Sequence, residues 1–533
     1  MNKIATYLNE HLLGEASSSK AMRRRFSRDN SILTLTPEIV VFPRVTNDIR
    51  KVARFTWQLA EKGHPMGVTV RGHGADTTAA AIGKGIVVDT SSHLSNILTI
   101  ATGDKLVHVQ PGVSLDVLHE ALKWQGLTIP GIPSDPCHAT VGGAIANNSA
   151  GAAMTYASAV DKLEVVLANG DIIETGRISK HEVNKKLGLQ TFEGEVYRKL
   201  SGLIEDNEEL LAQMSQDQAL DNTGYRSLAQ VRQKDGSFNL TPLFIGSQGT
   251  LGIISEAVLR AEFYSQDSVT AIIAAKGPEQ ARDIADQLVG LEPAKLFIVD
   301  GELVNRAHGY GKIFGVLGTE EVSGPVVYLE LNDFRERARL HKLKKVRKLA
   351  LKMGVGMVDS TDRDIEEFRQ LLDTPDATRR MADDDKVTLP IIDGAYVPFD
   401  RREEFSNVLS ELSDKQHVAL PTKVNGITGT IDVYPQLHLD SVSDKQKIFR
   451  LLSVYAESVH RCQGAFVSDG AEGRLKANAA WSILDDNEIA LFEAVRSIFD
   501  PFNTLNPGVK QPSDIRSLVT ALRTSYDTTD FVA

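Results

Sequence analysis

A glycine-rich segment near residue 70 has the residue types that could hold an anionic group. Residues 68–70 have the pattern of a short strand, and the chain then continues through two glycines spaced one residue apart. A strand that ends in Gly-x-Gly can fold its backbone N–H groups into a concave anion site without a lysine. A tight strand-to-loop turn would explain the same pattern. The candidate contacts here are Arg71, Gly72, His73, Gly74, Ala75, Asp76 and Thr77.

The spacing differs from two well-known nucleotide motifs. Thr77 stands where the third glycine of a Rossmann fingerprint belongs, and no lysine follows as in a Walker A loop. The segment therefore indicates a phosphate site of another kind.

Small residues crowd a second segment, between residues 130 and 151. Such side chains build a poor core, but they let the backbone approach something flat or charged very closely. A flavin ring with its ribityl chain fits this description, and a buried crossing of two segments is the alternative. The candidate contacts in this segment are Pro133, Asp135, Thr140, Gly142, Gly143, Asn147 and Gly151.

The elements that position these segments are short strands alternating with helices. The hydrophobic pattern predicts helices over 48–62, capped by Thr46 or Asn47, and over 115–125. Asn169-Gly170 predicts a hairpin within 160–176. Strands are predicted over 39–43, 66–70, 86–89 and 106–109, with strand-like sequence over 241–262.

The pattern changes near residue 265. Strands alternate with helices beyond this point, which predicts a separate α+β domain. The basic run 342–348 lies inside one of these helices and is broken by apolar residues at helical spacing, so it indicates the exposed face of a packed helix. The predicted strands are 269–274, 296–299 and 326–331, and the predicted helices are 278–291 and 335–353, the latter with an apolar stripe of Leu340, Leu343, Val346 and Ala350.

Composition excludes several classes of protein. The 533 residues suggest two to four domains, and a net charge of −11 argues against nucleic-acid binding. The only cysteines, Cys137 and Cys462, provide neither a disulfide framework nor an iron–sulfur cluster. They favour a reducing cytoplasm. With no signal peptide pattern and no apolar run of about 18 residues, we expect a soluble protein, with peripheral contact to the inner membrane left open.

Two further segments complete a pattern. Residues 244–254 read F-I-G-S-Q-G-T-L-G-I-I, and residues 499–510 contain Asn506-Pro507-Gly508. In this order the four segments resemble the FAD-linked oxidase family with a PCMH-type FAD-binding domain, nearest to its D-lactate, glycolate and D-2-hydroxyglutarate dehydrogenase branch. The resemblance spans roughly residues 27–510. It adds Tyr156, Gly249, Gly252, Ile253 and Asn506 to the expected FAD contacts.

The resemblance implies an α+β fold of three parts. Residues 1–265 would form the two-subdomain FAD-binding domain. Residues 266–480 would form a ferredoxin-like cap over the substrate, and residues 481–533 a helical segment that returns to the flavin.

Some residues depart from the family pattern. Relatives that hold FAD covalently use a histidine where this chain has Ala75, so non-covalent FAD is expected. His73 lies between the glycines and is interpreted as structural. Asp76 would repel a pyrophosphate unless it turns away or pairs with Arg71. Thr77 and Thr78 could then supply the hydroxyl groups that the family places nearby.

The cap motifs are altered more strongly. Where the branch has H-G-D-G-N-L-H, Asp432 replaces the first histidine and His438 keeps the second. Where it has E-H-G-I-G-R, Asp469 replaces the glutamate and Gly470 the histidine. One outcome is a divalent zinc or manganese ion held by Asp432, His438 and Asp469. The other is a lost metal and a different substrate.

The resemblance also suggests catalytic residues. Arg369 lies about where the branch binds the substrate carboxylate, although a surface arginine explains it equally well. Arg474 and Lys510 are candidates for stabilising charge near N1 of the reduced flavin, with Lys476 near the same face. His438 is the expected general base, because its ordinary pKa lies near neutrality.

The expected activity is hydride transfer from a small 2-hydroxy acid, such as D-lactate, to flavin N5. Oxygen, a quinone or a carrier protein would then take the electrons. Two alternatives stay open: a flavin oxidase of an alcohol, sugar or amine, and a flavin-binding protein whose cap has lost catalysis. The sequence does not indicate the oligomeric state.

Overall fold

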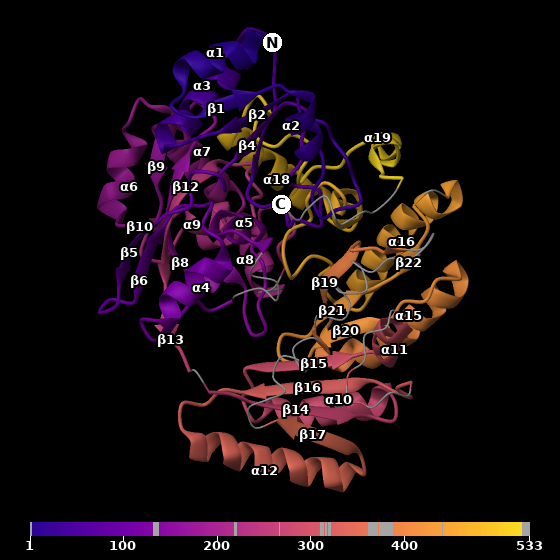
Figure 1. Cartoon of the computed structure of the whole chain (residues 1–533). Coiled ribbons are helices and arrows are strands. Elements are labelled where there is room, and N and C mark those ends of the chain that lie inside the picture. Colours follow the sequence, from indigo (N-terminus) through magenta and orange to yellow (C-terminus); the bar gives the residue numbers. More distant parts are fainter. Residues whose placement is uncertain are drawn as a thin grey trace.

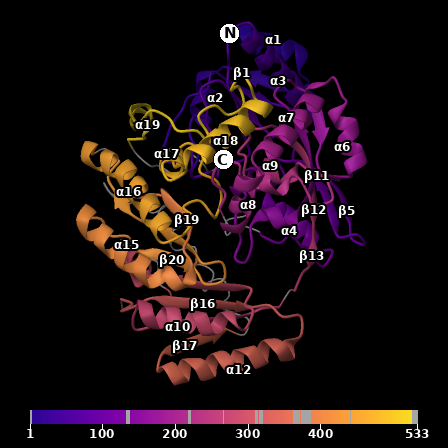
Figure 2. The same ribbon diagram turned by 180° about the vertical axis from the view of Figure 1, so that it is seen from behind.

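A computed structural model of the chain shows an upper body, a cap below it, and a C-terminal segment that returns to the upper body (Figures 1 and 2). The last helices, drawn in gold, lie beside the indigo N-terminal part, although they follow the orange cap elements along the chain. The structure describes residues 3–131, 138–217, 221–265, 267–309, 314, 317, 321–360, 371–372, 387–439 and 441–524.

The first layer of the upper body is a four-stranded sheet in the order β1-β2-β4-β3. β2 and β3 both run parallel to β4, and β1 is antiparallel to β2. β4 is buried along its whole length, which explains why it reads as an unbroken apolar run rather than an alternating one. The elements are α1 (Lys3–His11), β1 (Glu15–Ser17), α2 (Lys20–Arg25), β2 (Ile39–Phe42), α3 (Thr46–Glu61), β3 (Val68–Arg71) and β4 (Ile86–Asp89).

The second layer is a five-stranded antiparallel sheet in the order β5-β6-β12-β8-β9. The hairpin between β8 and β9 turns at Asn169-Gly170, where Gly170 has φ +85°. The elements are β5 (Ile97–Ala101), β6 (Leu106–Val109), α4 (Leu115–Lys123), β7 (Leu127–Thr128), α5 (Val141–Asn147), η2 (Tyr156–Ala159), β8 (Val160–Val166), β9 (Ile172–Glu174), β10 (Arg177–Ile178), α6 (Lys180–Leu187), α7 (Phe192–Asp206), α8 (Glu208–Asp217), η3 (Arg226–Gln230), β11 (Phe238–Asn239), α9 (Thr241–Phe244), β12 (Ile253–Arg260) and β13 (Glu262–Phe263).

The cap is built on a seven-stranded antiparallel sheet in the order β17-β14-β16-β15-β20-β21-β19. Buried residues of α10 and α12 pack on one face, and those of α11 pack on the other. The elements are β14 (Val269–Ala274), α10 (Pro278–Val289), β15 (Lys295–Val299), α11 (Gly301–Gly309), β16 (Val326–Leu331), α12 (Glu336–Met353), β17 (Gly356–Ser360), β18 (Val387–Thr388), β19 (Ile392–Tyr396), η4 (Phe399–Arg401), α15 (Arg402–Gln416), β20 (Thr422–Asn425), β21 (Thr430–Val433), β22 (Gln436–Leu437) and α16 (Val442–Arg461).

The C-terminal segment contains α17 (Ala477–Trp481), α18 (Asp486–Phe499) and α19 (Ile515–Ala521). Leu505 forms a parallel bridge with Val68, so the loop after α18 extends the first sheet beyond its edge strand β3. The largest hydrophobic core contains residues of the upper body, of α15 and α16, and of α18. The part of the cap nearest the upper body therefore shares its core.

Most predicted elements are present, with three differences. The N-cap residue of α3 is Val45, and Thr46 and Asn47 already belong to the helix. The strand-like sequence 241–262 begins with the short helix α9, since Pro242 suits a first helical turn. In α12, Leu343, Val346 and Ala350 are buried as predicted, whereas Leu340 is 41% exposed because it lies off the buried stripe.

Candidate active site

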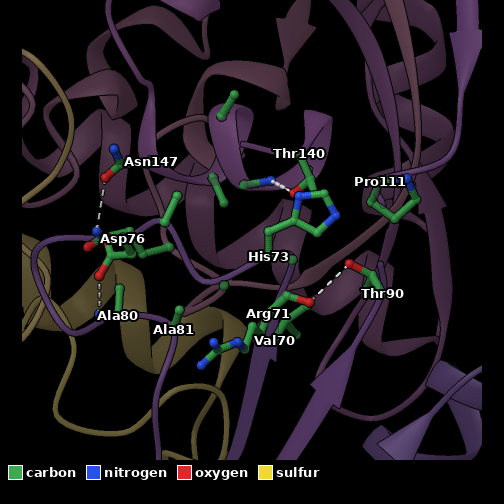
Figure 3. Close-up of a pocket in the computed structure, with 18 of the residues that line it drawn as sticks. Val70, Arg71, His73, Asp76, Ala80, Ala81, Thr90, Pro111, Thr140 and Asn147 are labelled. Carbon is green, nitrogen blue, oxygen red and sulfur yellow. Dashed lines mark hydrogen bonds between the residues drawn. The ribbon is translucent and has the colours of Figure 1, made fainter. Parts of the chain in front are cut away.

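A pocket with about 910 Å³ of space unfilled by protein atoms lies between the end of β3, helix α5 and the start of β12 (Figure 3). Its lining has little side-chain bulk, so the backbone itself forms much of the wall. His73 and Arg71 extend from the glycine-rich loop in this region, and Thr140 and Asn147 come from α5 and its cap. The small lining residues are Gly72, Gly74, Ala75, Ala80, Ala81, Ala139, Gly142, Gly143, Ala144, Ala146, Gly249 and Gly252.

At two positions of the lining, the backbone conformation favours glycine. Gly74 has φ +83°, and a Cβ there would lie 2.2 Å from a guanidinium nitrogen of Arg71. Gly249 has φ +72°. A Cβ added there would have no described heavy atom within 4 Å, so the space beside this glycine is open. Both positions are in the left-handed region that favours glycine. Glycine at these two positions therefore lets the loops adopt a left-handed conformation without a side chain at the pocket wall.

Helix α5 is fixed at both ends, which places Asn147 at the pocket. The Thr140 hydroxyl caps the first turn by accepting a hydrogen bond from the Gly143 N–H at 3.3 Å. Asn148 ends the helix with φ +50°. Asn147 Oδ1 then accepts a hydrogen bond from Gln248 Nε2 at 3.2 Å.

Gln248 joins three segments that are distant in the sequence. Its side chain donates to Thr78 Oγ1 at 3.1 Å and to Asn147 Oδ1, and its Oε1 accepts from the Gly473 N–H at 2.8 Å. Asn506 supports it from behind, because Asn506 Nδ2 donates to the carbonyl oxygens of Gln248 and Ala80, both at 2.8 Å.

Asp76 is the acidic group of the pocket. Burial raises the pKa of this carboxyl to about 7, and the negative charge of Asp29 adds to the rise. The carboxyl turns toward its own loop, where it accepts hydrogen bonds from the Ala80 N–H at 2.6 Å and the Thr78 N–H at 3.0 Å. Burial lowers the pKa of the Arg71 guanidinium, and the charges of Asp29 and Asp89 oppose that shift. Arg71 Nη1 donates to the Arg28 carbonyl oxygen at 2.5 Å.

A segment of the cap, residues 468–473, is hydrogen-bonded to two residues of the pocket lining. The Ala471 N–H donates to Asn147 Oδ1 at 3.1 Å, and Gly473 reaches Gln248 as described above. Asn222 holds the start of this segment, because its Nδ2 donates to the carbonyl oxygens of Ser468 at 2.6 Å and Gly470 at 3.1 Å. We call residues 468–473 the cap segment.

Three carboxyl groups lie near one another here, one of them in the cap segment and two beside it. Asp393, on β19, accepts hydrogen bonds from Thr77 Oγ1 at 2.9 Å and from Lys476 Nζ. The neighbouring Gly394 N–H donates to Asp432 Oδ1 at 2.8 Å. Burial, together with the negative charge of Asp432, raises the pKa of Asp469 to about 7. The described site therefore places a carboxyl group that titrates near neutrality next to the small-residue pocket.

Two family models match this chain. One, described as an FAD binding domain, matches residues 37–176, and the other, described as the C-terminal domain of FAD linked oxidases, matches residues 261–509. The chain belongs to the FAD-linked oxidase family. Its cofactor is FAD, as the sequence predicted.

Named relatives of this FAD-linked oxidase agree with the predicted branch. The D-2-hydroxyglutarate dehydrogenase of Pantoea ananatis is 24% identical over 95% of this chain and 52% of the relative. The glycolate oxidase subunit GlcD of Bacillus subtilis is 25% identical over 91% of this chain and 92% of the relative. The chain spans about half the length of the D-2-hydroxyglutarate dehydrogenase.

Solved structures confirm the predicted fold class. A 4-ethylphenol oxidase from Gulosibacter chungangensis superposes with a TM-score of 0.67 at 13% identity, covering 95% of this chain and 96% of the other. An alkyldihydroxyacetonephosphate synthase superposes with a TM-score of 0.65 at 12% identity, covering 95% and 84%. These similarities concern the fold alone.

No helix within the described ranges combines the length and apolarity needed to cross a bilayer.

The structure brings most of the predicted FAD contacts to one pocket. Thr77 and Asn506 lie outside its lining: Asn506 supports the lining residues Gln248 and Ala80, and Thr77 donates a hydrogen bond to Asp393. Gly151 is also outside, and Tyr156 is fully buried in the core, where burial raises its pKa. Pro133 and Asp135 fall outside the described residues. The predicted contacts that line the pocket are Arg71, Gly72, His73, Gly74, Ala75, Asp76, Thr140, Gly142, Gly143, Asn147, Gly249, Gly252 and Ile253.

The predicted metal site is not assembled in the part of this FAD-linked oxidase that the structure describes. No three His, Cys, Asp or Glu side chains there form a group that could hold a metal ion. The backbone N–H of His438 donates to Asp444 Oδ2 at 3.0 Å, at the start of α16. His438 does not line the pocket, so its prediction as general base also lacks support.

The predicted cationic residues have structural partners instead. Lys510 is fully buried in an ion pair of 2.6 Å with Glu472. Arg474 donates to the carbonyl oxygens of Pro507 at 2.7 Å and Ile82 at 3.2 Å, and burial lowers its pKa to about 10. Neither residue lines the pocket. Arg369 falls outside the described residues.

The sequence reasoning missed two polar residues of the site. Gln248 was inside a recognised motif, and its place between two glycines was the available signal. Asp393 had no motif around it, because its partners Thr77 and Lys476 are far away along the chain.

Proposed function

We propose that this chain binds FAD non-covalently in the small-residue pocket and oxidises a small 2-hydroxy acid beside the cap segment. The observation that carries the proposal is the junction at Asn147, where the pocket wall and the Ala471 N–H of the cap segment meet. A substrate held there would lie between a flavin and the carboxyl groups of the cap. The names of the relatives, D-2-hydroxyglutarate dehydrogenase and glycolate oxidase subunit, support this substrate class.

The residues of the pocket fit FAD. The wall is lined by glycine and alanine, and the open side of Gly249 leaves room where a side chain would otherwise project. Ala75 carries no nucleophile for a covalent bond to the flavin. Arg71 and the backbone N–H groups of the glycine-rich loop would contact the pyrophosphate. Bound FAD supplies a two-electron acceptor for a hydride from the substrate C–H bond.

Asp469 is the residue best placed to accept the hydroxyl proton of the substrate. It directly precedes Gly470 in the cap segment, and its pKa of about 7 lets it hold or release a proton near neutral pH. The cap segment also keeps water away from the junction, because Ala471 and Gly473 are tied to the upper body.

A second candidate function is oxidation of an alcohol, sugar or amine. The observation that favours it is the missing group of three metal ligands among the described residues. A site without a metal has one less way to bind a 2-hydroxy carboxylate.

Absorbance of the purified chain tests the proposal. Flavin bands that move to the supernatant after acid precipitation would support non-covalent FAD, and colour kept in the pellet would contradict it. The FAD-loaded protein is then mixed without oxygen with D-lactate, D-2-hydroxyglutarate or glycolate, and loss of the flavin band is followed. We expect at least one hydroxy acid to bleach the flavin, and the Asp469→Asn variant to do so roughly 100-fold more slowly.

Bleaching by a primary alcohol, sugar or amine alone would favour the second candidate. A protein that binds FAD but is bleached by none of these substrates would overturn both enzymatic proposals.

A further inference from the structure

The cap contains a second cavity that the proposed reaction does not use. It lies between α10 and α15, which Figure 2 shows near one another on the cap, and the strands β15, β20 and β21 form its floor. About 1140 Å³ of its space is unfilled by protein atoms. Its apolar lining includes Ile298, Phe405, Leu409, Leu420, Val424 and Ile431.

Arg402 lines this cavity, and two of its three guanidinium nitrogens are buried without a hydrogen-bond partner among the described residues. It is the first residue of α15 and is only 8% exposed. Its Nε and Nη2 have no hydrogen-bond partner, and no described residue forms an ion pair with it. The guanidinium carbon lies 3.7 Å from the centre of the Phe399 ring, which supports one face of the group. A buried guanidinium without an anion is unfavourable, since burial removes its hydration.

None of the other charged residues on the described wall of the cavity forms an ion pair with Arg402. Asp300 Oδ1 accepts a hydrogen bond from the Glu302 N–H at 3.0 Å, and Glu302 itself pairs with Arg306 at 2.5 Å. Both acids of the wall are therefore engaged elsewhere. The negative charge of Asp286 raises the pKa of Arg402, against the lowering by burial. Asp286 is exposed, and no ion pair joins it to Arg402 among the described residues. Arg282 lines the same cavity and adds positive charge.

The helix α15 strengthens the positive potential. Arg402 lies at its N-terminus, where the backbone dipoles of this 15-residue helix place partial positive charge and no side chain caps it, and the exposed Glu403 and Glu404 of the same turn offset part of that charge. An anion in the cavity would therefore be stabilised by the guanidinium, by Arg282 and by the helix end. The serine hydroxyls of Ser406 and Ser410 are also on the wall.

We propose that this cavity binds a small molecule with an apolar body and one carboxylate group. The carboxylate would accept paired hydrogen bonds from Arg402, the geometry that a guanidinium favours. The apolar body would lie on Ile298, Val424 and Ile431. This combination follows from the lining, which is apolar on the sheet side and cationic at the start of α15.

The cavity and the candidate active site lie on opposite faces of β21. Ile431 lines the cavity, whereas the next residue, Asp432, is hydrogen-bonded to Gly394 beside Asp469. Alternate side chains of a strand point to opposite faces of the sheet. The proposed ligand is therefore bound independently of FAD and of the substrate.

Calorimetric titration of the FAD-loaded full chain with octanoate tests the proposal, with 1-octanol as the neutral probe. We expect octanoate to bind at least tenfold more tightly to the native chain than to Arg402→Met, and octanol to bind both equally. The flavin spectrum should not change. Ser410→Trp, at an exposed position of α15, fills the cavity and should abolish octanoate binding.

Thermal unfolding separates a ligand-binding arginine from a structural one. Without octanoate, Arg402→Met should unfold at the same or a higher temperature than the native chain, because a buried unpaired charge has been removed. A clear fall in this temperature would overturn the proposal. Equal octanoate affinity in the native chain and Arg402→Met, or unchanged binding in Ser410→Trp, would also overturn it.

Discussion

Asp76 shows how burial alone changes the chemistry of one side chain. Its carboxyl group is surrounded by its own loop and lies near Asp29, so the protonated form is favoured up to about pH 7. The unfolded chain has no such environment, and there the group ionises near its ordinary pKa of 3.8. Between pH 3.8 and about pH 7, Asp76 is therefore protonated in the folded chain and ionised in the unfolded chain.

This difference fixes the sign of a pH dependence. Stability conferred by the protonated Asp76 falls as the pH rises from about 4 to about 7, and the loss is complete above that window. Asp76→Asn has no ionisable group at this position, so it lacks this loss of stability. The free energy of unfolding of the variant minus that of the native chain should therefore increase by roughly 2–4 kcal/mol from pH 4 to pH 8. Urea unfolding of the full chain in excess FAD at both pH values measures it. A difference that stays constant with pH would contradict the assignment.

At the scale of elements, the loop after α18 completes the first sheet. The Val68 N–H donates to the Thr504 carbonyl oxygen and the Asn506 N–H donates to the Val68 carbonyl oxygen, both at 2.7 Å. Thr69 Oγ1 donates to Asn506 Oδ1 at 2.9 Å. The loop thus behaves as a further strand that covers the edge of β3, the strand leading into the glycine-rich loop.

We expect Asn506→Ala to loosen this contact and the pocket behind it. The substitution removes one accepted and two donated side-chain hydrogen bonds, all buried, and should lower the free energy of unfolding by about 2–4 kcal/mol. Because Ala80 and Gln248 lose their support, FAD should also dissociate faster, which flavin fluorescence during dilution measures.

Asn503→Ala is the matched control for this prediction. Asn503 has φ +51°, close to the φ +43° of Asn506, but its side chain accepts one hydrogen bond, from Arg496. Equal effects of both substitutions would show that backbone strain, rather than the hydrogen bonds of Asn506, is responsible.

At the scale of the whole molecule, the cap and the upper body are joined where the site lies. The largest core is continuous between them, and Asn222 fastens the cap segment through two hydrogen bonds. Asn222 also accepts a hydrogen bond from Asn148 Nδ2 at 2.9 Å, next to α5. Asn222 therefore helps to position the cap segment over the pocket, together with Asn147 and Gln248.

Asn222→Ala should misplace the cap segment and slow reduction of the flavin by roughly 10–100-fold, because catalysis depends on the position of the substrate within about 1 Å. Stopped-flow absorbance with the hydroxy acid identified above measures the rate. Asn305→Ala is the control, since Asn305 makes two hydrogen bonds with Val322 inside the cap. A similar slowing in both variants would point to general loosening of the cap.

The sequence alone determined the parts of the protein that depend on neighbours along the chain. The glycines of residues 71–74 and the small residues around α5 could be recognised because a backbone cradle needs small residues in a continuous stretch. The strands β4 and β16 were predicted at their observed bounds, because each consists mainly of apolar residues. The order of the four motifs was sufficient for the family and for FAD.

Only the tertiary structure decided which charged and polar groups serve the site. Lys510 appeared catalytic beside a motif, but folding places Glu472 against it, and the pair is buried away from the pocket. His438 kept a family position, yet its surroundings contain no described group of metal ligands. Conversely, Asp393 and Arg402 had no sequence signal. The physical reason is that burial and pairing determine the role of an ionisable group, and its partners come from segments that only folding brings together.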